Sequence, residues 1–408
     1  MAEKNGNPKR VRIYSLKMKI CKHFNICGGC KLQDVTYQKQ LKLKTNLITR
    51  RADKYGVIVK GRLKKILPSP IKYDYRNKME FTFYAEEDGG VCLGLHGNKQ
   101  NRRVIELKEC FIAGVEVINV LRVTLNFARK HNLKGYHRYK QKGYLRHLLI
   151  RKSVSSKELM VIIATTSKGR LKKSEYVKKL LSLTRSRNNG YKITSIFHVV
   201  NDSVGDALSF EKVKLLHGKE FLEEDVGRIT YRIYNQSFFQ TNSRCLRVLY
   251  NAAKKLIKPE KKDRVLDLFC GSGGIGLYIA KSVKDVVGIE INEQAIIKAH
   301  ENMDINGIKN MSFIQADVRL ALKDKKDELQ GSFNKVIIDP PRAGISRKVF
   351  ERVVALKIPQ VLYISCNPES LFDNSRLFIE AGYKLKVVQS VDMFPHTRHV
   401  ETLVLLEK

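Results

Sequence analysis

The sequence predicts an α/β protein with a C-terminal doubly wound domain, a β-rich central domain and a cysteine-containing N-terminal segment. Three observations support this prediction. Apolar runs alternate with helix-length segments after residue 234, short β-rich runs fill the region before it, and three cysteines lie close together near the start. A chain of 408 residues is also long enough for several domains. We expect four parts: a basic tail at 1–20, a cysteine loop and helix at 21–65, the central domain at 66–234 and the C-terminal domain at 235–408.

The charge of the chain indicates its partner. Lys and Arg number 77 against 40 Asp and Glu, which gives a formal net charge of +37. An excess of this size favours a polyanion, most commonly nucleic acid, although a generally lysine-rich surface is the alternative. No apolar run approaches the roughly 18 residues that cross a membrane, and MAEKNGNPKRVR lacks the apolar core of a signal peptide. We therefore expect a cytoplasmic protein with no membrane partner, and a monomer by default.

The N-terminal cysteines have the spacing of a metal-binding loop. In CKHFNICGGC, Cys21, Cys27 and Cys30 follow a C-x5-C-x2-C pattern, and the two glycines let the backbone fold tightly so that thiolates converge. Cys110 in ELKECFIAG is the best candidate for a fourth ligand. Four thiolates suit either zinc or an iron–sulfur cluster. Because zinc sites usually use C-x2-C pairs from both sides and this set has one pair, the spacing favours a 4Fe–4S cluster.

The segments that follow predict a helix and then a sheet. A helix is expected over residues 35–55, and the central region reads as an antiparallel sheet with inserted helices near 114–131 and 172–187. Within it, residues 129–151 carry eight Lys or Arg, three Tyr and three His without an acid. Cations neutralise phosphates and tyrosine rings stack on bases, so this segment suits RNA, with a solvated hairpin as the alternative.

A second basic stretch stands at a turn before the first central strand. Arg76, Asn77 and Lys78 in YDYRNKMEF have the chemistry for phosphate or base contacts. We therefore expect RNA to meet the protein in this region as well.

After residue 234 strands and helices alternate, which predicts a parallel sheet with ligands at the carboxyl ends of its strands. DRVLDLFCGSGGIGLYIA gives a buried strand, a glycine-rich turn and a helix, and such a turn serves either a dinucleotide or S-adenosylmethionine. Glu290 ends the second strand, Asp317 ends the third, and Asp339 in DPP ends the fourth. Three successive acids at the ligand edge suit methyl transfer better than hydride transfer. We therefore predict a Rossmann-like class I methyltransferase domain that binds S-adenosylmethionine.

The stretch VLYISCNPESL ends an apolar run with Cys366 beside an Asn-Pro turn, where a free thiol is usually core filler. The surrounding motifs indicate another role. They are FFQTN at 238–242, DLFCGSGGIGL at 267–277, GIEIN at 288–292, DPPRAG at 339–344, SCNP at 365–368 and HVETLVLLE at 399–407. Together they resemble the RNA 5-methyluridine methyltransferase family, which transfers a methyl group from S-adenosylmethionine to uracil C5 in ribosomal or transfer RNA. The cysteines at 21, 27, 30 and 110 match its iron–sulfur branch.

The resemblance implies roles for individual residues. Cys366 is the expected nucleophile that adds to uracil C6, and Glu401 is the expected base that removes the C5 proton. Covalent activation is needed because uracil C5 is a weak nucleophile. Arg342 is expected to steady the uracil or a phosphate, and Gly274 stands where many relatives carry Asn. The expected cofactor contacts are Gln240, Phe269, Gly274, Glu290, Asp317 and Asp339.

The resemblance also narrows the substrate. Many relatives carry an N-terminal RNA-binding β-barrel, whereas 20 residues precede Cys21 here. The tail and the central domain are therefore expected to supply the RNA affinity, which should fall steeply with salt. Because iron–sulfur members frequently modify ribosomal RNA, a uridine of 23S ribosomal RNA is the expected target, with transfer RNA as the alternative. Two rival functions need no reactive thiol: a base-amino methyltransferase and a non-enzymatic iron–sulfur RNA-binding sensor.

Overall fold

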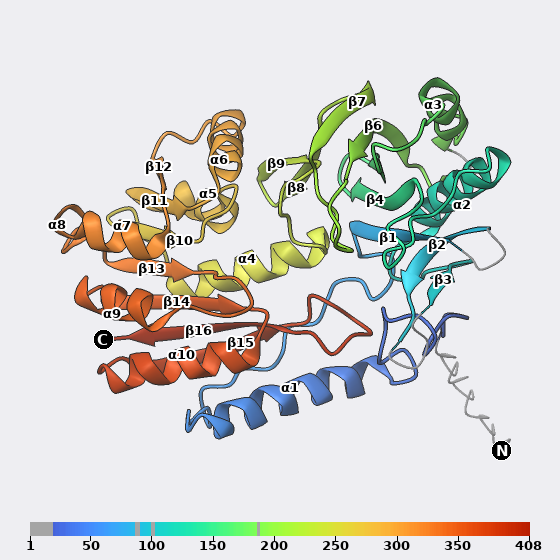
Figure 1. Cartoon of the computed structure of the whole chain (residues 1–408). Coiled ribbons are helices and arrows are strands. Elements are labelled where there is room, and N and C mark those ends of the chain that lie inside the picture. Colours follow the sequence, from blue (N-terminus) through green and yellow to red (C-terminus); the bar gives the residue numbers. More distant parts are fainter. Residues whose placement is uncertain (1–18, 86–89, 99–102, 186–187) are drawn as a thin grey trace, which may run out of the picture.

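The computed structural model describes residues 19–85, 90–98, 103–185 and 188–408. Its framework is a pair of seven-stranded sheets, and helix α1 (Tyr37–Lys54) runs along the C-terminal sheet beside α10 (Pro368–Glu380), as Figure 1 shows. The basic tail expected at 1–20 lies almost wholly outside the described residues. None of the helices in the described part of the chain is long and apolar enough to cross a membrane.

The central sheet has the strand order β3-β2-β1-β4-β5-β6-β7. Its strands are β1 (Lys78–Ala85), β2 (Val91–His96), β3 (Val104–Glu106), β4 (Leu145–Ser153), β5 (Glu158–Thr165), β6 (Lys192–Val200) and β7 (Lys212–Gly218). Two helices, α2 (Val115–Lys130) and α3 (Lys173–Leu181), confirm the predicted insertions, although α3 ends earlier than expected. Their apolar residues pack with those of the strands into one core.

One strand pair in this sheet departs from the prediction. All neighbouring pairs are antiparallel except β5 and β6, which are parallel. The expectation of a wholly antiparallel sheet was therefore wrong at this pair. The reason is that α3 forms a crossover connection between β5 and β6, which returns the chain in the same direction.

The C-terminal sheet has the strand order β12-β11-β10-β13-β14-β16-β15 and confirms the Rossmann-like prediction. Its strands are β10 (Arg264–Leu268), β11 (Asp285–Glu290), β12 (Met311–Gln315), β13 (Lys335–Ile338), β14 (Gln360–Ser365), β15 (Lys384–Val391) and β16 (Glu401–Glu407). Pairs from β12 to β14 are parallel, whereas β16 is antiparallel to both of its neighbours. Sequence reasoning missed β15, and β15 and β16 form an antiparallel pair joined by a loop.

Helices cover both faces of this sheet. Besides α10 they are α4 (Ser243–Ile257), α5 (Gly274–Ala280), α6 (Glu293–Ile305), α7 (Val318–Asp324), α8 (Lys326–Leu329) and α9 (Arg347–Ala355). Alternate strand residues enter two different cores, because successive side chains of a strand point to opposite faces. Leu266 and Val336 belong to one core, and Val265 and Ile337 to the other.

Two segments outside residues 235–408 share these cores. Ile48 and Ala52 of α1 are fully buried in the core that contains α9 and α10. The hairpin of β8 (Phe221–Val226) and β9 (Ile229–Tyr234) places Val226 and Tyr231 in the core that contains α4. The C-terminal fold is therefore completed by residues that come before it in the chain.

Candidate active site

A cleft of about 1560 Å³ is lined by residues of both sheets. Met79, Phe197 and Leu215 of the central sheet form part of one wall, and the opposite wall comes from the carboxyl ends of the C-terminal strands. This is the edge at which doubly wound sheets bind ligands. Of the predicted site residues, the cleft brings together Gln240, Phe269, Gly274, Glu290, Asp339, Arg342, Cys366 and Glu401.

Strand register places the two predicted catalytic residues side by side. Ser365 at the end of β14 pairs with Thr402 of the antiparallel β16. Cys366 directly follows Ser365 at the end of β14 and Glu401 directly precedes Thr402 in β16, so the register brings both residues to the same end of this strand pair. The turn after Cys366 is held by Asn367, whose side chain caps α10 by accepting a hydrogen bond from the Glu369 amide at 3.2 Å.

The environment controls the ionisation of this pair. Glu401 is only 3% exposed, and burial, with the nearby charge of Asp339 second, raises its pKa to about 8. Burial also raises the pKa of the Cys366 thiol, and the Glu401 carboxylate raises it further. The guanidinium of Arg342 acts in the opposite direction on Cys366. In the ligand-free cleft at neutral pH, Glu401 is therefore mostly protonated.

Further carboxylates gather at the same end of the cleft. Burial raises the pKa of Asp339 to about 7. Burial also raises the pKa of Asp267 to about 8, and the charges of Asp339 and Glu290 add to it. Such a group of mutually repelling acids is destabilising when charged and favours a cationic ligand.

The glycine-rich turn after β10 has a specific backbone shape. Phe269 adopts a left-handed conformation with φ of 63°, which is costly for a residue with a side chain and is found most often at functional sites. The turn is tied to the end of β11, because Glu290 accepts hydrogen bonds from the amides of Gly271 at 3.1 Å and Asn292 at 2.9 Å. Phe269 and Glu290 thereby face the same part of the cleft.

The absence of a side chain at Gly274 is explained by its neighbours. A Cβ at this position would lie 2.6 Å from the hydroxyl of Tyr250, which is buried in the adjoining core. The Gly274 carbonyl also accepts a hydrogen bond from the Tyr231 hydroxyl at 2.7 Å. Tyr250 occupies the space that a side chain would need, so Gly274 can offer only its backbone to a ligand.

Asp317 is the predicted cofactor contact that does not line the cleft. Its carboxylate caps α7 by accepting a hydrogen bond from the Leu320 amide at 3.1 Å, and it pairs with Arg319 at 3.6 Å. An acid at the end of a strand and start of a helix serves equally well as an N-cap, which the sequence pattern alone does not distinguish.

The segment before α4 presents an aromatic ring that sequence reasoning missed. Phe238 is 77% exposed and lines the cleft next to Gln240. The segment is fixed from the central domain, since the Asn77 amide donates to the Gln240 carbonyl at 2.9 Å and Arg151 donates to the Ser237 carbonyl. Its position at the cleft, together with its exposure, leaves the Phe238 ring free to contact a ligand there.

Several residues expected to meet RNA are structural instead. Asn77 is only 5% exposed and holds the backbone near Gln240. Within 129–151, Arg146 and Arg151 are buried in β4, and Arg146 donates to carbonyls of the loop after β6. The expectation of RNA contacts was therefore wrong for these side chains, because they are buried and donate hydrogen bonds to backbone carbonyls. Tyr139 in the same segment is 78% exposed, with the Arg138 guanidinium 4.5 Å from its ring.

The four cysteines predicted as ligands lie around a second, much smaller pocket. Cys21, Cys27, Cys30 and Cys110 all line it, and it shares Gly29 with the active-site cleft. Burial, with the charges of the other three thiols, raises the pKa of Cys30 to about 12. Among the described residues, no group of three or more His, Cys, Asp or Glu side chains is arranged to hold a metal ion. The four cysteines thus share one pocket, but the described part of the chain shows no assembled metal site.

Comparison with known proteins gives consistent results. The family model for tRNA (uracil-5-)-methyltransferase matches residues 36–408. An uncharacterized RNA methyltransferase of Caldanaerobacter subterraneus subsp. tengcongensis is 37% identical over 95% of this chain and 84% of its own length. One from Clostridium tetani is 37% identical over 97% of this chain and 85% of its own length. Among solved structures, the tRNA (uracil-54, C5)-methyltransferase of Pyrococcus abyssi, in complex with S-adenosyl-L-homocysteine, matches with a TM-score of 0.74 and 27% identity over 93% of this chain and 86% of its own.

Proposed function

Because this chain belongs to the tRNA (uracil-5-)-methyltransferase family and is an S-adenosylmethionine-dependent RNA methyltransferase, we propose that it methylates C5 of one uridine through a covalent bond between Cys366 and uracil C6. The observation that carries the proposal is that Cys366 and Glu401, which adjoin the paired residues Ser365 and Thr402, line the same cleft at the ligand edge of the sheet. A thiol nucleophile next to a buried carboxylic acid is the pair that this chemistry needs.

The proposed reaction assigns one step to each of these residues. In its thiolate form, favoured by Arg342, Cys366 adds to C6 and makes C5 enolate-like. When bound, S-adenosylmethionine supplies the electrophilic methyl group that C5 takes up. Glu401 then removes the proton from C5, the bond between C6 and sulfur breaks, and the double bond between C5 and C6 is restored with Cys366 released as thiolate.

The acidic end of the cleft supports the cofactor assignment. We assign Gln240, Phe269, Glu290 and Asp339 to the binding of S-adenosylmethionine, with Gly274 contributing its backbone. The sulfonium of S-adenosylmethionine is a cation, and a cation near Asp339 and Glu401 lowers the pKa of both carboxylic acids. Cofactor binding would thus ionise Glu401 and prepare it to act as a base.

The cysteine pocket supports a 4Fe–4S cluster held by Cys21, Cys27, Cys30 and Cys110. Each iron of such a cluster takes one thiolate, and four cysteines that line one pocket can supply them. The spacing, with a single C-x2-C pair, favours the cluster over zinc, whose sites usually use such pairs from both sides. Gln33 also donates a hydrogen bond to the Cys30 sulfur at 3.2 Å, a contact that helps to hold a thiolate. The proposed role is structural, because the methyl transfer moves no net electrons.

For the RNA we propose 23S ribosomal RNA first, on the resemblance to the iron–sulfur branch. Transfer RNA is the second candidate, and the similarity to the Pyrococcus abyssi tRNA enzyme favours it. In either RNA the target base must leave its stack to reach Cys366, since the thiol lies inside a cleft. Phe238 is placed at the cleft to stack on an unstacked base.

The test is anaerobic incubation of the protein, and of a Glu401→Gln variant, with labelled S-adenosylmethionine and separate ribosomal and transfer RNA pools. We expect 5-methyluridine in one pool, and a variant that stays covalently attached to that RNA on denaturing gels. Label in an amino group of adenine or cytosine would instead support a base-amino methyltransferase. Cofactor binding without transfer to either pool would support the non-enzymatic sensor.

A further inference from the structure

The loop that joins β15 to β16, residues 392–400, leads directly into Glu401 and lines the cleft with Phe394, Thr397 and His399. The backbone carbonyls of residues 392, 393, 394, 395 and 396 each accept a hydrogen bond from a donor outside the loop. The donors are, in that order, the Cys245 thiol, the Asn242 amide, the Lys44 ammonium, the Tyr75 hydroxyl and the backbone amides of Lys31 and Leu32. Four separate parts of the chain therefore hold this one loop.

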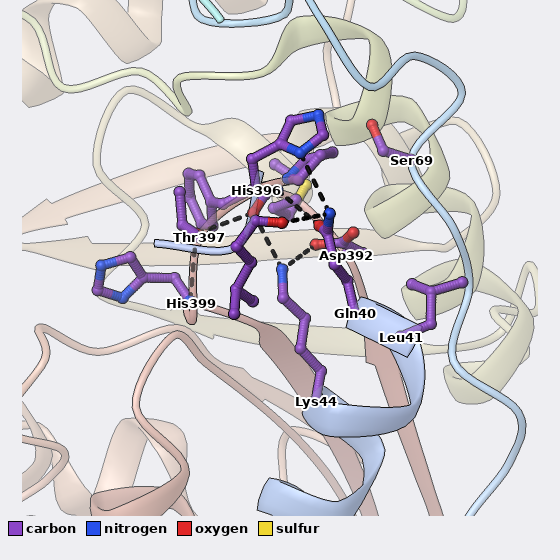
Figure 2. Close-up of polar contacts among 12 residues, drawn as sticks. Gln40, Leu41, Lys44, Ser69, Asp392, His396, Thr397 and His399 are labelled. Atoms are coloured by element: carbon purple, nitrogen blue, oxygen red, sulfur yellow. Dashed lines mark hydrogen bonds and ion pairs between the residues drawn. The ribbon is translucent and has the colours of Figure 1, made fainter. Parts of the chain in front are cut away.

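Helix α1 contacts this loop through buried side chains. Its buried residues Gln40, Lys44, Ile48 and Ala52 follow one another at a spacing of four, so they form a single stripe along the helix. Ile48 and Ala52 pack in an apolar core, whereas Gln40 and Lys44 point at the loop, as Figure 2 shows. The stripe thus changes from apolar to polar where it meets residues 392–400.

The polar contacts are specific and deeply buried. Lys44 forms an ion pair with Asp392, with side-chain exposures of 1% and 0%, and donates to the Phe394 carbonyl at 2.9 Å (Figure 2). Gln40 accepts from the His396 amide at 2.9 Å, and its own amide lies 3.2 Å from Nδ1 of His396. The same Gln40 amide contacts the Leu32 carbonyl at 2.8 Å, so Gln40 links the cysteine loop to His396.

Stability alone does not account for these groups. A buried ion pair is often matched or exceeded in stability by an apolar pair of similar volume, because both charges lose their hydration. Buried polar contacts are directional, so they select one conformation of the segments they join more strictly than apolar contacts do. His396 needs such definition, since its φ of 66° is a left-handed conformation that a residue with a side chain adopts only when its surroundings enforce it.

We propose that Gln40 and Lys44 are positioning residues for the proposed base: they hold residues 392–400 in the arrangement that places the Glu401 carboxylate beside Cys366. The cysteine loop takes part through the amides of Lys31 and Leu32, which directly follow Cys30. The inference rests on the proposed function, because Glu401 acts as a base only in that reaction.

A displaced base produces a signature that loss of stability does not. If Glu401 is misplaced, removal of the C5 proton slows while the earlier addition of Cys366 to C6 continues, so the covalent enzyme–RNA adduct accumulates during turnover. We expect this for Gln40→Met and for the double variant Lys44→Met with Asp392→Leu. The double variant replaces the whole ion pair with apolar side chains, which preserves stability, but it still removes the contact with the Phe394 carbonyl.

Lys335 provides a matched control at the opposite end of the same sheet. It is 8% exposed, pairs with Asp263 at 3.2 Å and donates to the carbonyls of Ile257 and Lys258, so it is a buried lysine with the same kinds of partner as Lys44. Lys335→Met should lose thermal stability without accumulating adduct, because Lys335 stands at the start of β13 and far along the sheet from its ligand edge.

The measurement compares wild type, Glu401→Gln, Gln40→Met, the double variant and Lys335→Met with the RNA pool that is methylated. We expect Gln40→Met and the double variant to turn over about 10- to 100-fold more slowly with unchanged affinity for S-adenosylmethionine, and to carry more adduct on denaturing gels than Lys335→Met. One outcome would overturn this inference and leave the proposed function standing. In that outcome Glu401→Gln accumulates adduct, whereas Gln40→Met and the double variant turn over at the wild-type rate and carry no more adduct than wild type. Absence of adduct and of 5-methyluridine in wild type and Glu401→Gln would overturn both.

Discussion

The affinity for S-adenosylmethionine should rise with pH, because the acids that face the cofactor must ionise to favour its sulfonium. Asp339, with a pKa of about 7, sets the minimum size of the effect. From that value about 9% of Asp339 is ionised at pH 6 and about 91% at pH 8, so binding that requires the carboxylate weakens about tenfold from pH 8 to pH 6. Glu401 and Asp267, each with a pKa of about 8, titrate in the same direction and can only steepen the change.

Calorimetry with two ligands tests this reasoning. S-adenosylhomocysteine has the same nucleoside and amino acid parts but lacks the sulfonium charge, so its dissociation constant should change much less between pH 6 and pH 8. Binding of S-adenosylmethionine at pH 7 should release protons, about half a proton from Asp339 alone. Asp339→Asn, which has no carboxylate to ionise at this position, should bind S-adenosylmethionine at pH 8 at least about tenfold more weakly than wild type does at pH 8. A ratio of the two ligands' dissociation constants that stays constant, or that reverses with pH, would refute the argument.

Three further outcomes follow from the site. Cys366→Ala should lose both methylation and the RNA adduct while binding S-adenosylmethionine as wild type does, and residual methylation of C5 would contradict the thiol mechanism. Phe238→Ala should raise the KM for RNA about 5- to 150-fold, which corresponds to one lost stacking contact, and should leave the affinity for S-adenosylmethionine unchanged. Ile58→Ala removes another exposed apolar side chain and is the control. It should change neither the KM for RNA nor the affinity for S-adenosylmethionine. Cys110→Ala should lower the iron content of anaerobically purified protein and its melting temperature, and unchanged iron would remove Cys110 from the cluster.

The sequence was sufficient to predict which residues lie at the ligand edge of the C-terminal sheet. Apolar runs that end in Glu290, Asp339 and Cys366 each identify the end of a buried strand, and parallel strands bring such ends together. Only the resemblance predicted that Glu401 lies near Cys366. The antiparallel register of β14 and β16 depends on the intervening strand β15. Polar residues within β15 kept it from being recognised as a strand in the sequence. Local patterns fix an element but not its partners.

Burial of polar groups was the other property that could not be predicted. Asn77 and Arg151 have the composition of an RNA-binding surface, yet the structure uses their donors on backbone carbonyls around Phe238. In the sequence Lys44 likewise has the pattern of a solvent-facing residue on a polar helix. Its buried partner, Asp392, is far away in the chain, and no local pattern predicts their pairing. Charged residues are buried only when a distant partner compensates them, and that partner is visible only in three dimensions.

The contact between α1 and residues 392–400 also has a consequence for how the protein is made. Gln40 and His396 are separated by 356 positions, so a ribosome working at about 5–20 residues per second completes the second partner about 20–70 s after the first. Throughout that time α1 has its polar stripe unpaired and its apolar residues without their core. The earliest helix of the described chain is thus among the last to reach its native contacts. A partly synthesised chain therefore cannot hold the proposed base, Glu401, beside the proposed nucleophile, Cys366.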